Sequence, residues 1–193
     1  MTEAEQLPTL RYAYKASVAG SPQAFELTGQ GMSFQTGFRS GVWPYGDIAR
    51  IRLTYRPVSM LRHRFRADIR HKDGRTLKIF SATWAGIVAM TPQNDSYRAF
   101  IEELHRRIAA EGRGVECVAG LQPIAFAMAI VVYGAITFAI AALFVRALMT
   151  GEFIAALFLV GFVAWSAWYV GGWMMRNKPQ QYAPQSLPAQ LLP

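Results

Sequence analysis

The chain has 193 residues, of which 52% are hydrophobic and only 17% are charged, and its formal net charge is +8. In soluble domains about a quarter of all residues are charged. The high hydrophobic content and low charged content of this chain therefore exclude a disordered or collagen-like protein and indicate a nonpolar segment. The single cysteine, Cys117, excludes a disulfide scaffold and is typical of the cytoplasm.

Residues 1–9 form an acidic tail without an apolar core, so we expect no cleavable signal peptide there. Residues 10–111 have the pattern of an antiparallel sheet, because short runs of alternating apolar residues are separated by turn-forming residues. These runs are a hairpin over 25–34 around Gly29-Gln30-Gly31, a strand with Ile51, Leu53 and Tyr55, a strand over 62–71, and a return strand over 75–80.

One amphipathic helix is expected to close this domain. The triplet Asn94-Asp95-Ser96 offers a helix N-cap, and apolar residues then recur at helical spacing as far as Ile108. Glu102 with Arg106 and Glu103 with Arg107 are spaced as ion pairs on the solvent-exposed side. Gly112 and Gly114 predict the end of the helix, and residues 112–120 are expected to be a linker.

Two apolar runs of 23 residues follow, over 123–145 and 153–175, within a segment spanning 121–175. A membrane-spanning helix needs about 20 apolar residues, so both runs are long enough. The seven-residue connection predicts an antiparallel transmembrane hairpin. Basic residues concentrate before the first run and directly after the second, so positive-inside logic places both termini in the cytoplasm, at a bacterial inner membrane.

The hairpin itself contains no ionisable residue near its centre, which argues against a transport pathway. Small residues four positions apart allow close helix packing, either between the two helices or with a second copy or another membrane protein. These residues are Ala135, Ala139, Ala167 and Gly171. Trp173, Arg176 and Lys178 are expected to anchor the second helix at the membrane interface, and residues 176–193 are expected to be a disordered, proline-rich tail.

The segments FELTGQGMSF, PYGDIARIRL, DIRHKDGRTLKIF and SYRAFIEELHRRI resemble a bacterial PH-like domain of the pleckstrin-homology superfold. The resemblance covers roughly residues 10–110 and implies an α+β fold, an antiparallel sheet or barrel capped by one C-terminal helix, here followed by the transmembrane hairpin. The expected closing helix lacks the tryptophan usual in eukaryotic members, and the hairpin over 25–34 has no lysine or arginine. The resemblance therefore does not imply phosphoinositide binding.

Basic residues are concentrated between Arg50 and Arg75, where nine lysines and arginines accompany two aspartates. In the strand over 62–71, alternation places Phe65, Ala67 and Ile69 on one side and arginines on the other. The expected positive patch consists of Arg50, Arg52, Arg62, Arg64, Arg66 and Arg70. Such a patch either docks on anionic headgroups or an acidic protein, or is simply solvated. No recognition helix or RNA-binding pattern points to nucleic acid.

Motifs for catalysis are missing from the sequence. The G-x-G at Gly29 to Gly31 lacks the third glycine of a dinucleotide fingerprint, and there is no Walker loop, no G-x-S-x-G and no metal-ligand cluster. The three histidines, His63, His71 and His105, are expected at the surface or core edge. We therefore expect no cofactor, no metal and no enzymatic activity. The expected function is that of a membrane scaffold or lipid-docking module, or of an accessory subunit that is recognised through its hairpin. The expected partners are membrane lipids and either another membrane protein or a second copy of the chain in a homo-oligomer.

Overall fold

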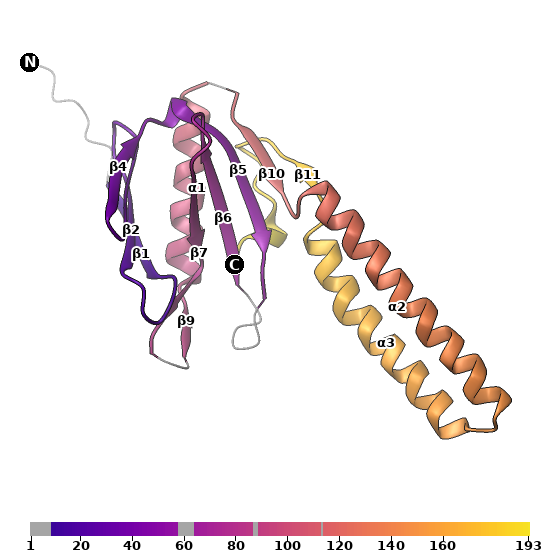
Figure 1. Cartoon of the computed structure of the whole chain (residues 1–193). Helices are drawn as coiled ribbons and strands as arrows, with labels where there is room; N and C mark the ends of the chain where they lie inside the picture. Colours follow the sequence, from indigo (N-terminus) through magenta and orange to yellow (C-terminus); the bar gives the residue numbers. More distant parts are fainter. Residues whose placement is uncertain (1–8, 58–63, 87–88, 113) are drawn as a thin grey trace, which may run out of the picture. The chain divides into compact units, whose positions relative to one another are not determined.

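The computed structural model describes residues 9–57, 64–86, 89–112 and 114–193 (Figure 1). The chain divides into two compact units. The sheet unit contains the residues up to Ala119 together with Gln180–Pro193, and the hairpin unit contains Gly120–Pro179. A β-rich region followed by two long apolar helices is the organisation that the sequence predicts, in an α+β protein.

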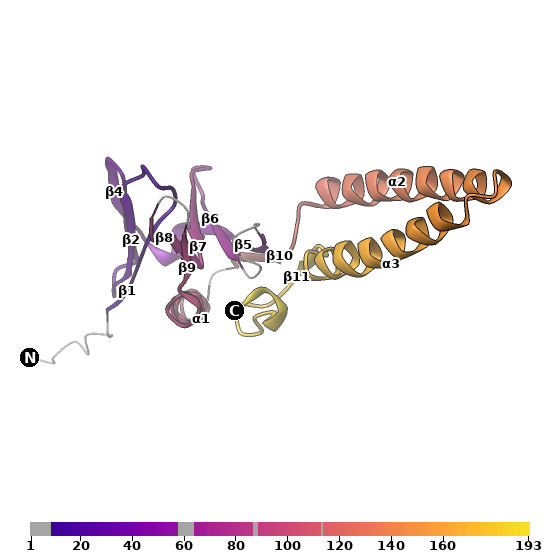
Figure 2. The same cartoon turned by 90° about the horizontal axis from the view of Figure 1, so that it is seen from below.

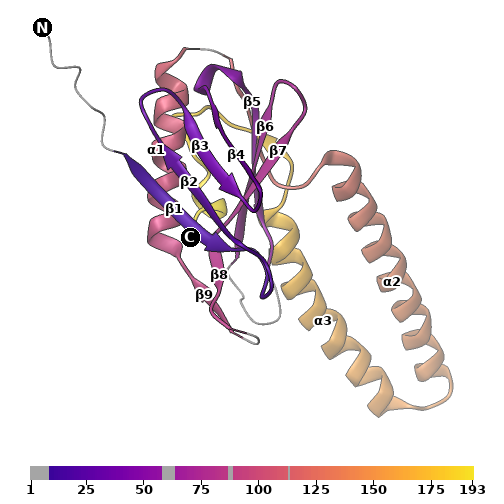
Figure 3. The ribbon, with the colours of Figure 1, turned by 60° about the vertical axis from the view of Figure 1, so that its left-hand side comes forward.

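The first sheet is an antiparallel meander of four strands in chain order, as Figure 3 shows. Its strands are β1 (Leu10–Lys15), β2 (Pro22–Leu27), β3 (Met32–Thr36) and β4 (Arg39–Trp43). No strand is predicted for β1, so the hairpin over 25–34 is second in the sheet rather than first. Because β1 carries Arg11 and Lys15, the first hairpin of the sheet does contain basic residues.

The second sheet has the strand order β11-β10-β5-β6-β7. Three of its strands pair antiparallel, β5 (Ile48–Tyr55), β6 (Phe65–His71) and the edge strand β7 (Thr76–Phe80), and a short 3-10 helix, η1 (Tyr45–Asp47), leads into β5. The predicted turn at Lys72 to Gly74 joins β6 to β7, with Gly74 at a φ of +91°. A small hairpin of β8 (Ala82–Trp84) and β9 (Met90–Pro92) follows.

Helix α1 (Asn94–Ala110) closes the core of the sheet unit. Its fully buried apolar side chains are Tyr97, Phe100, Ile101, Leu104 and Ile108, at the predicted helical spacing. Figure 2, in which α1 is seen nearly end-on, shows the helix at the open side between the two sheets.

The predicted N-cap of this helix is wrong by one residue. The first helical hydrogen bond runs from the Tyr97 backbone N–H to the Gln93 carbonyl, so Gln93 is the cap and Asn94 already lies inside the helix. No side chain caps this end.

Two segments outside the predicted domain complete the sheet unit. The expected linker contains β10 (Glu116–Ala119), which pairs in parallel with β5 and buries Cys117 and Ala119. Where a disordered tail is predicted, β11 (Gln180–Gln181) pairs with β10, and Leu191 in the 3-10 helix η2 (Ala189–Leu191) is fully buried. Both corrections have one cause, which is that segments of two to four residues gain structure from tertiary partners and carry no periodicity of their own.

The hairpin unit contains α2 (Pro123–Met149) and α3 (Phe153–Arg176), so α2 is four residues longer than the predicted run. Both helices are long and apolar enough to cross a membrane, judged by length and composition. At the open end of the hairpin the Leu121 N–H donates to the Asn177 carbonyl over 3.0 Å, and the Asn177 side chain donates to the Trp173 carbonyl over 3.1 Å. The bonds at Asn177 join the start of α2 to the end of α3.

Candidate anion-binding face

The candidate site is the outward side of β5 and β6, whose inward side belongs to the core. Ile51, Leu53, Ala67 and Ile69 are fully buried, and the residues that alternate with them are mostly arginines, with Asp68 and Thr54 among them. We call these the arginine face, made up of Arg50, Arg52, Arg56, Arg64, Arg66 and Arg70. Arg62, which the sequence places in the same patch, lies outside the described residues.

A local irregularity sets the direction of the side chains in β5. The pairing with β6 shifts between Ile48 and Arg50, which is the signature of a β-bulge. Because one extra residue is accommodated there, both Ile48 and Ile51 are buried although they are three positions apart. Beyond the bulge, Arg50 lies opposite Arg70 and Arg52 lies opposite Asp68, so arginines of both strands share one side.

Carboxylates neutralise only part of this face. Arg50 pairs with Glu116 of the neighbouring strand β10, with 2.6 Å between Nη2 and Oε2. Arg66 forms an ion pair with Asp68 two residues further along β6. The guanidinium of Arg64 instead lies over the ring of Phe80 at 4.1 Å, a cation–π contact that leaves its charge uncompensated.

The arginines influence each other electrostatically. Partial burial lowers the pKa of Arg52, and the charge of Arg50 lowers it further. Burial likewise lowers the pKa of Arg56, with a further contribution from Arg66. For Arg64, burial again lowers the pKa and the charges of Arg66 and Arg56 add to it, whereas Tyr14 acts in the opposite direction. Guanidinium groups stay protonated at neutral pH, so these shifts mean that the cations are partly buried and lie close to one another.

Two donors of this face are buried without use. The Nε atoms of Arg64 and Arg66 have no hydrogen-bond acceptor within the part of the chain that the structure describes. Buried polar groups normally find a partner, and an unpaired donor on a charged group is costly. Oδ1 of Asp68 is likewise buried without a donor among the described residues, so it is the partly exposed guanidinium groups of the face that can donate hydrogen bonds to the oxygen atoms of an anionic group.

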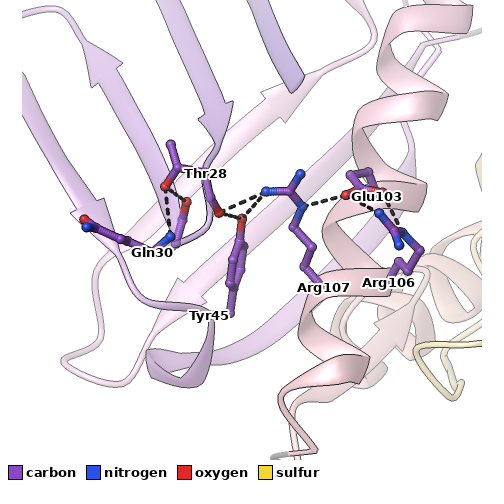
Figure 4. A network of polar contacts seen from close by, with 7 residues as sticks. Thr28, Gln30, Tyr45, Glu103, Arg106 and Arg107 are labelled. Atoms are coloured by element: carbon purple, nitrogen blue, oxygen red, sulfur yellow. Dashed lines mark hydrogen bonds and ion pairs between the residues drawn. The ribbon is translucent and has the colours of Figure 1, made fainter. Parts of the chain in front are cut away.

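A second arginine cluster, in Figure 4, has a structural role. Arg107 of α1 is buried, and its guanidinium donates to Glu103 over 2.6 Å, to the Thr28 carbonyl over 2.9 Å and to the Tyr45 hydroxyl over 3.2 Å. The predicted ion pair of Glu103 and Arg107 thus forms, but it lies within the protein rather than on the solvent-exposed side of α1. It ties α1 to the β2–β3 turn and to η1.

The other predicted ion pair on α1, Glu102 with Arg106, is wrong, because each of these residues pairs with a different partner. Arg106 pairs with Glu103 over 2.7 Å, and Glu102 pairs with Arg98 over 2.9 Å. Glu103 lies three residues before Arg106 and four residues before Arg107, so both arginines reach its carboxylate. Glu103 therefore accepts hydrogen bonds from two guanidinium groups.

Histidine and cysteine do not form a metal site within residues 9–57, 64–86, 89–112 and 114–193, where no three His, Cys, Asp or Glu side chains gather. His63 lies outside the described residues, and His71 contacts Asp73 at 3.0 Å. His105 is fully buried in α1, not at the core edge. Cys117 is buried in β10, where burial raises the pKa of its thiol to about 11.

The predicted helix-packing residues lie on free surfaces of the hairpin unit. Ala135, Ala139 and Ala167 are exposed, and Gly171 is half-buried. The two helices instead meet through a hydrogen bond between the hydroxyls of Tyr133 and Ser166 over 3.3 Å. An open apolar groove of about 340 Å³ also lies between them, lined by Thr137, Ile140, Ala141, Phe144, Leu159, Val160, Val163 and Ala164.

The predicted interface anchors lie at the end of α3. Trp173 is half-buried, whereas Arg176 and Lys178 are exposed. A tryptophan followed within one turn by cations is the arrangement that anchors a helix at the edge of a bilayer.

No protein-family model matches the chain, and no curated protein matches it either. The resemblance to PH-like domains therefore stays a prediction from the sequence. Sequence reasoning missed Glu116 and Phe80 as partners of the arginine face. The sequence signal for Phe80 was its alternation with the buried Ile79 in β7, which places the two side chains on opposite sides of the strand. Glu116 gave no such signal, because its strand β10 is too short to show a period.

Proposed function

We propose that this chain is a non-enzymatic scaffold of a bacterial inner membrane, with both termini in the cytoplasm and a PH-like sheet unit that binds anionic groups through its arginine face. The hairpin fixes the sheet unit at the membrane. The single observation that carries the proposal is the charge imbalance on the arginine face, where six arginines of the described residues meet the two carboxylates of Glu116 and Asp68.

The chemistry favours carboxylates and phosphate diesters as partners. Guanidinium groups bind both types of anion through paired hydrogen bonds, and they are less strongly hydrated than an ammonium group. Near an anionic membrane each Lys or Arg contributes about 1 kcal/mol, and added salt reduces this. The partner is accordingly an acidic protein surface or the anionic headgroups of the membrane.

The test is extraction of the full-length chain in mild detergent at low and at moderate salt, followed by mass spectrometry of the bound proteins and lipids. The triple variant Arg52→Gln, Arg56→Gln, Arg64→Gln removes three cations from the face. The matched control is Arg11→Gln, Arg75→Gln, Arg106→Gln, which changes the net charge equally at exposed positions outside the face.

The proposal expects an acidic protein or an anionic lipid that is retained by the control and lost from the triple variant or with salt. A retained protein identifies a scaffold for that protein, and retained lipid alone identifies a lipid-docking module. Equal retention by both variants would remove the arginine face as the working surface.

A second candidate is an accessory subunit of a larger membrane complex that is recognised through the hairpin. The observation in its favour is that Ala135, Ala139 and Ala167 are exposed in the single chain, where a second copy or another membrane protein can approach closely. A stoichiometric membrane protein, retained at both salt levels and by both triple variants, would select this function.

A further inference from the structure

One end of the first sheet displays apolar side chains on ordered loops. In the meander, the β1–β2 and β3–β4 connections lie at the same end. Phe38, in the β3–β4 turn, has a relative exposure of 108%, and Val18, in the β1–β2 loop, has one of 44%. Single exposed apolar residues are ordinary on a protein surface, but two adjacent protruding tips form a distinct feature.

Both loops are held in place by the chain. The last residue pair of β3 and β4 is Thr36 with Arg39, so the turn consists of Gly37 and Phe38 alone, and Gly37 supplies the φ of +60° that such a tight turn requires. The β1–β2 loop is fixed by Trp84, whose indole donates to the Ala16 carbonyl over 3.1 Å. A rigid turn keeps Phe38 extended away from the core instead of letting it fold back.

The surroundings of these tips are cationic. The segments 15–22 and 36–40 contain Lys15 and Arg39 and no acidic residue. Both cations are exposed, and neither belongs to any of the ion pairs that the structure describes. Apolar tips beside unpaired cations match the bilayer interface, where acyl chains lie next to anionic headgroups.

We propose that this tip surface, made up of Lys15, Val18, Phe38 and Arg39, inserts into the interface of an anionic bilayer. The occupant is a membrane because α2 and α3 are long and apolar enough to span one, which makes a bilayer the apolar phase that this chain meets permanently. The inference rests on the proposed membrane location, but it goes beyond the proposed binding function, since it concerns residues of the first sheet and requires nothing of the arginine face.

The test uses the full-length chain with a single added cysteine that carries an environment-sensitive fluorophore. Phe38→Cys places the probe in the turn, and Val42→Cys is the matched control in the strand β4 that follows, four residues and about 13 Å away. Cys117 is buried with a raised pKa, so it resists labelling at neutral pH, which labelling of the unsubstituted chain verifies. The chain is reconstituted in phosphatidylcholine vesicles with and without phosphatidylglycerol.

With phosphatidylglycerol present, we expect blue-shifted emission from the probe at position 38 and quenching by spin-labelled lipid, whereas the probe at 42 responds to iodide in the water. Adding Lys15→Ser or Arg39→Ser should weaken docking about fivefold each. Equal iodide quenching at positions 38 and 42 would overturn the proposal. The triple arginine variant described above should leave the signal at position 38 unchanged, so the two proposals fail independently.

Discussion

The imidazole of His105 accepts a hydrogen bond from the hydroxyl of Tyr182, with 2.9 Å between Nε2 and the hydroxyl oxygen. The direction follows from the other ring nitrogen, since Nδ1 lies 2.7 Å from the Ile101 carbonyl, which only accepts. The ring therefore carries its proton on Nδ1 when it is neutral. This bond connects α1 to the segment that follows the membrane hairpin, 77 positions later.

Replacing Tyr182 by phenylalanine should destabilise the sheet unit. The change removes the donor and leaves the Nε2 of His105 buried without a partner, at a cost of about 1–3 kcal/mol. The measurement is guanidinium unfolding of the detergent-solubilised full-length chain, followed by tryptophan fluorescence. Tyr169→Phe, at an exposed position of α3, is the control and should unfold like the parent chain. Identical midpoints for both variants would show that the bond contributes nothing.

Acid should weaken the same region. Burial lowers the pKa of His105 below the ordinary value of 6.5, so the unfolded chain takes up a proton at a higher pH than the folded chain. The contribution of the neutral ring to stability is therefore complete above pH 6.5 and declines as the pH falls through 6.5 toward the lower folded pKa. Unfolding curves between pH 7.5 and about 5 should show this decline. A His105→Gln chain should lose less stability over that range, and an equal loss would contradict the assignment.

Leu191 should be a core residue despite its place in a proline-rich segment. Its side chain is fully buried, so Leu191→Ala creates a cavity and should cost about 2–5 kcal/mol. The measurement is limited proteolysis of the full-length chain. Loosening of η2 by the substitution should make cleavage faster. Ala189→Gly changes an exposed residue of the same turn and should leave cleavage slow. If both variants resist the protease equally, residues 189–193 do not pack as described.

Two glycines of the β2–β3 connection should differ sharply in their tolerance of replacement by alanine. A Cβ on Gly31 would overlap the backbone carbonyl of Trp43, whereas a Cβ on Gly29 would meet nothing within 4 Å. Overpacking of this kind costs about 1–3 kcal/mol, so Gly31→Ala should lower the unfolding midpoint clearly. Gly29→Ala should leave the midpoint nearly unchanged. Similar midpoints for the two variants would refute the close approach of the chain at Gly31.

Local patterns predict the longer elements of this protein well. The turn at Asp73-Gly74 and the alternation of Phe65, Ala67 and Ile69 identify β6 and β7, because one buried face imposes a period of two. The helix over residues 94–110 and the apolar hairpin follow from length and spacing alone. β10 and β11 are different, since four and two residues are too few to show a period.

The candidate site was predictable in part for the same reason. Alternation predicts which side of the strand carries Arg64 and Arg66, but not which side chains from other strands contact the arginine face. Glu116 reaches Arg50 only because β10 lies parallel to β5, a pairing between residues 66 positions apart. Phe80 reaches Arg64 across the β6–β7 pair. Such long-range partners are set by the assembled sheet.

The pairing of Ala119 with Gln180 has a consequence for biosynthesis. The strand that precedes the hairpin and the strand that follows it are neighbours in one sheet, so a ribosome must synthesise all of residues 120–179 before β11 can join β10. The β10 edge of the sheet unit therefore remains unpaired until α2 and α3 have been synthesised, and its final closure marks a chain whose hairpin has already been made.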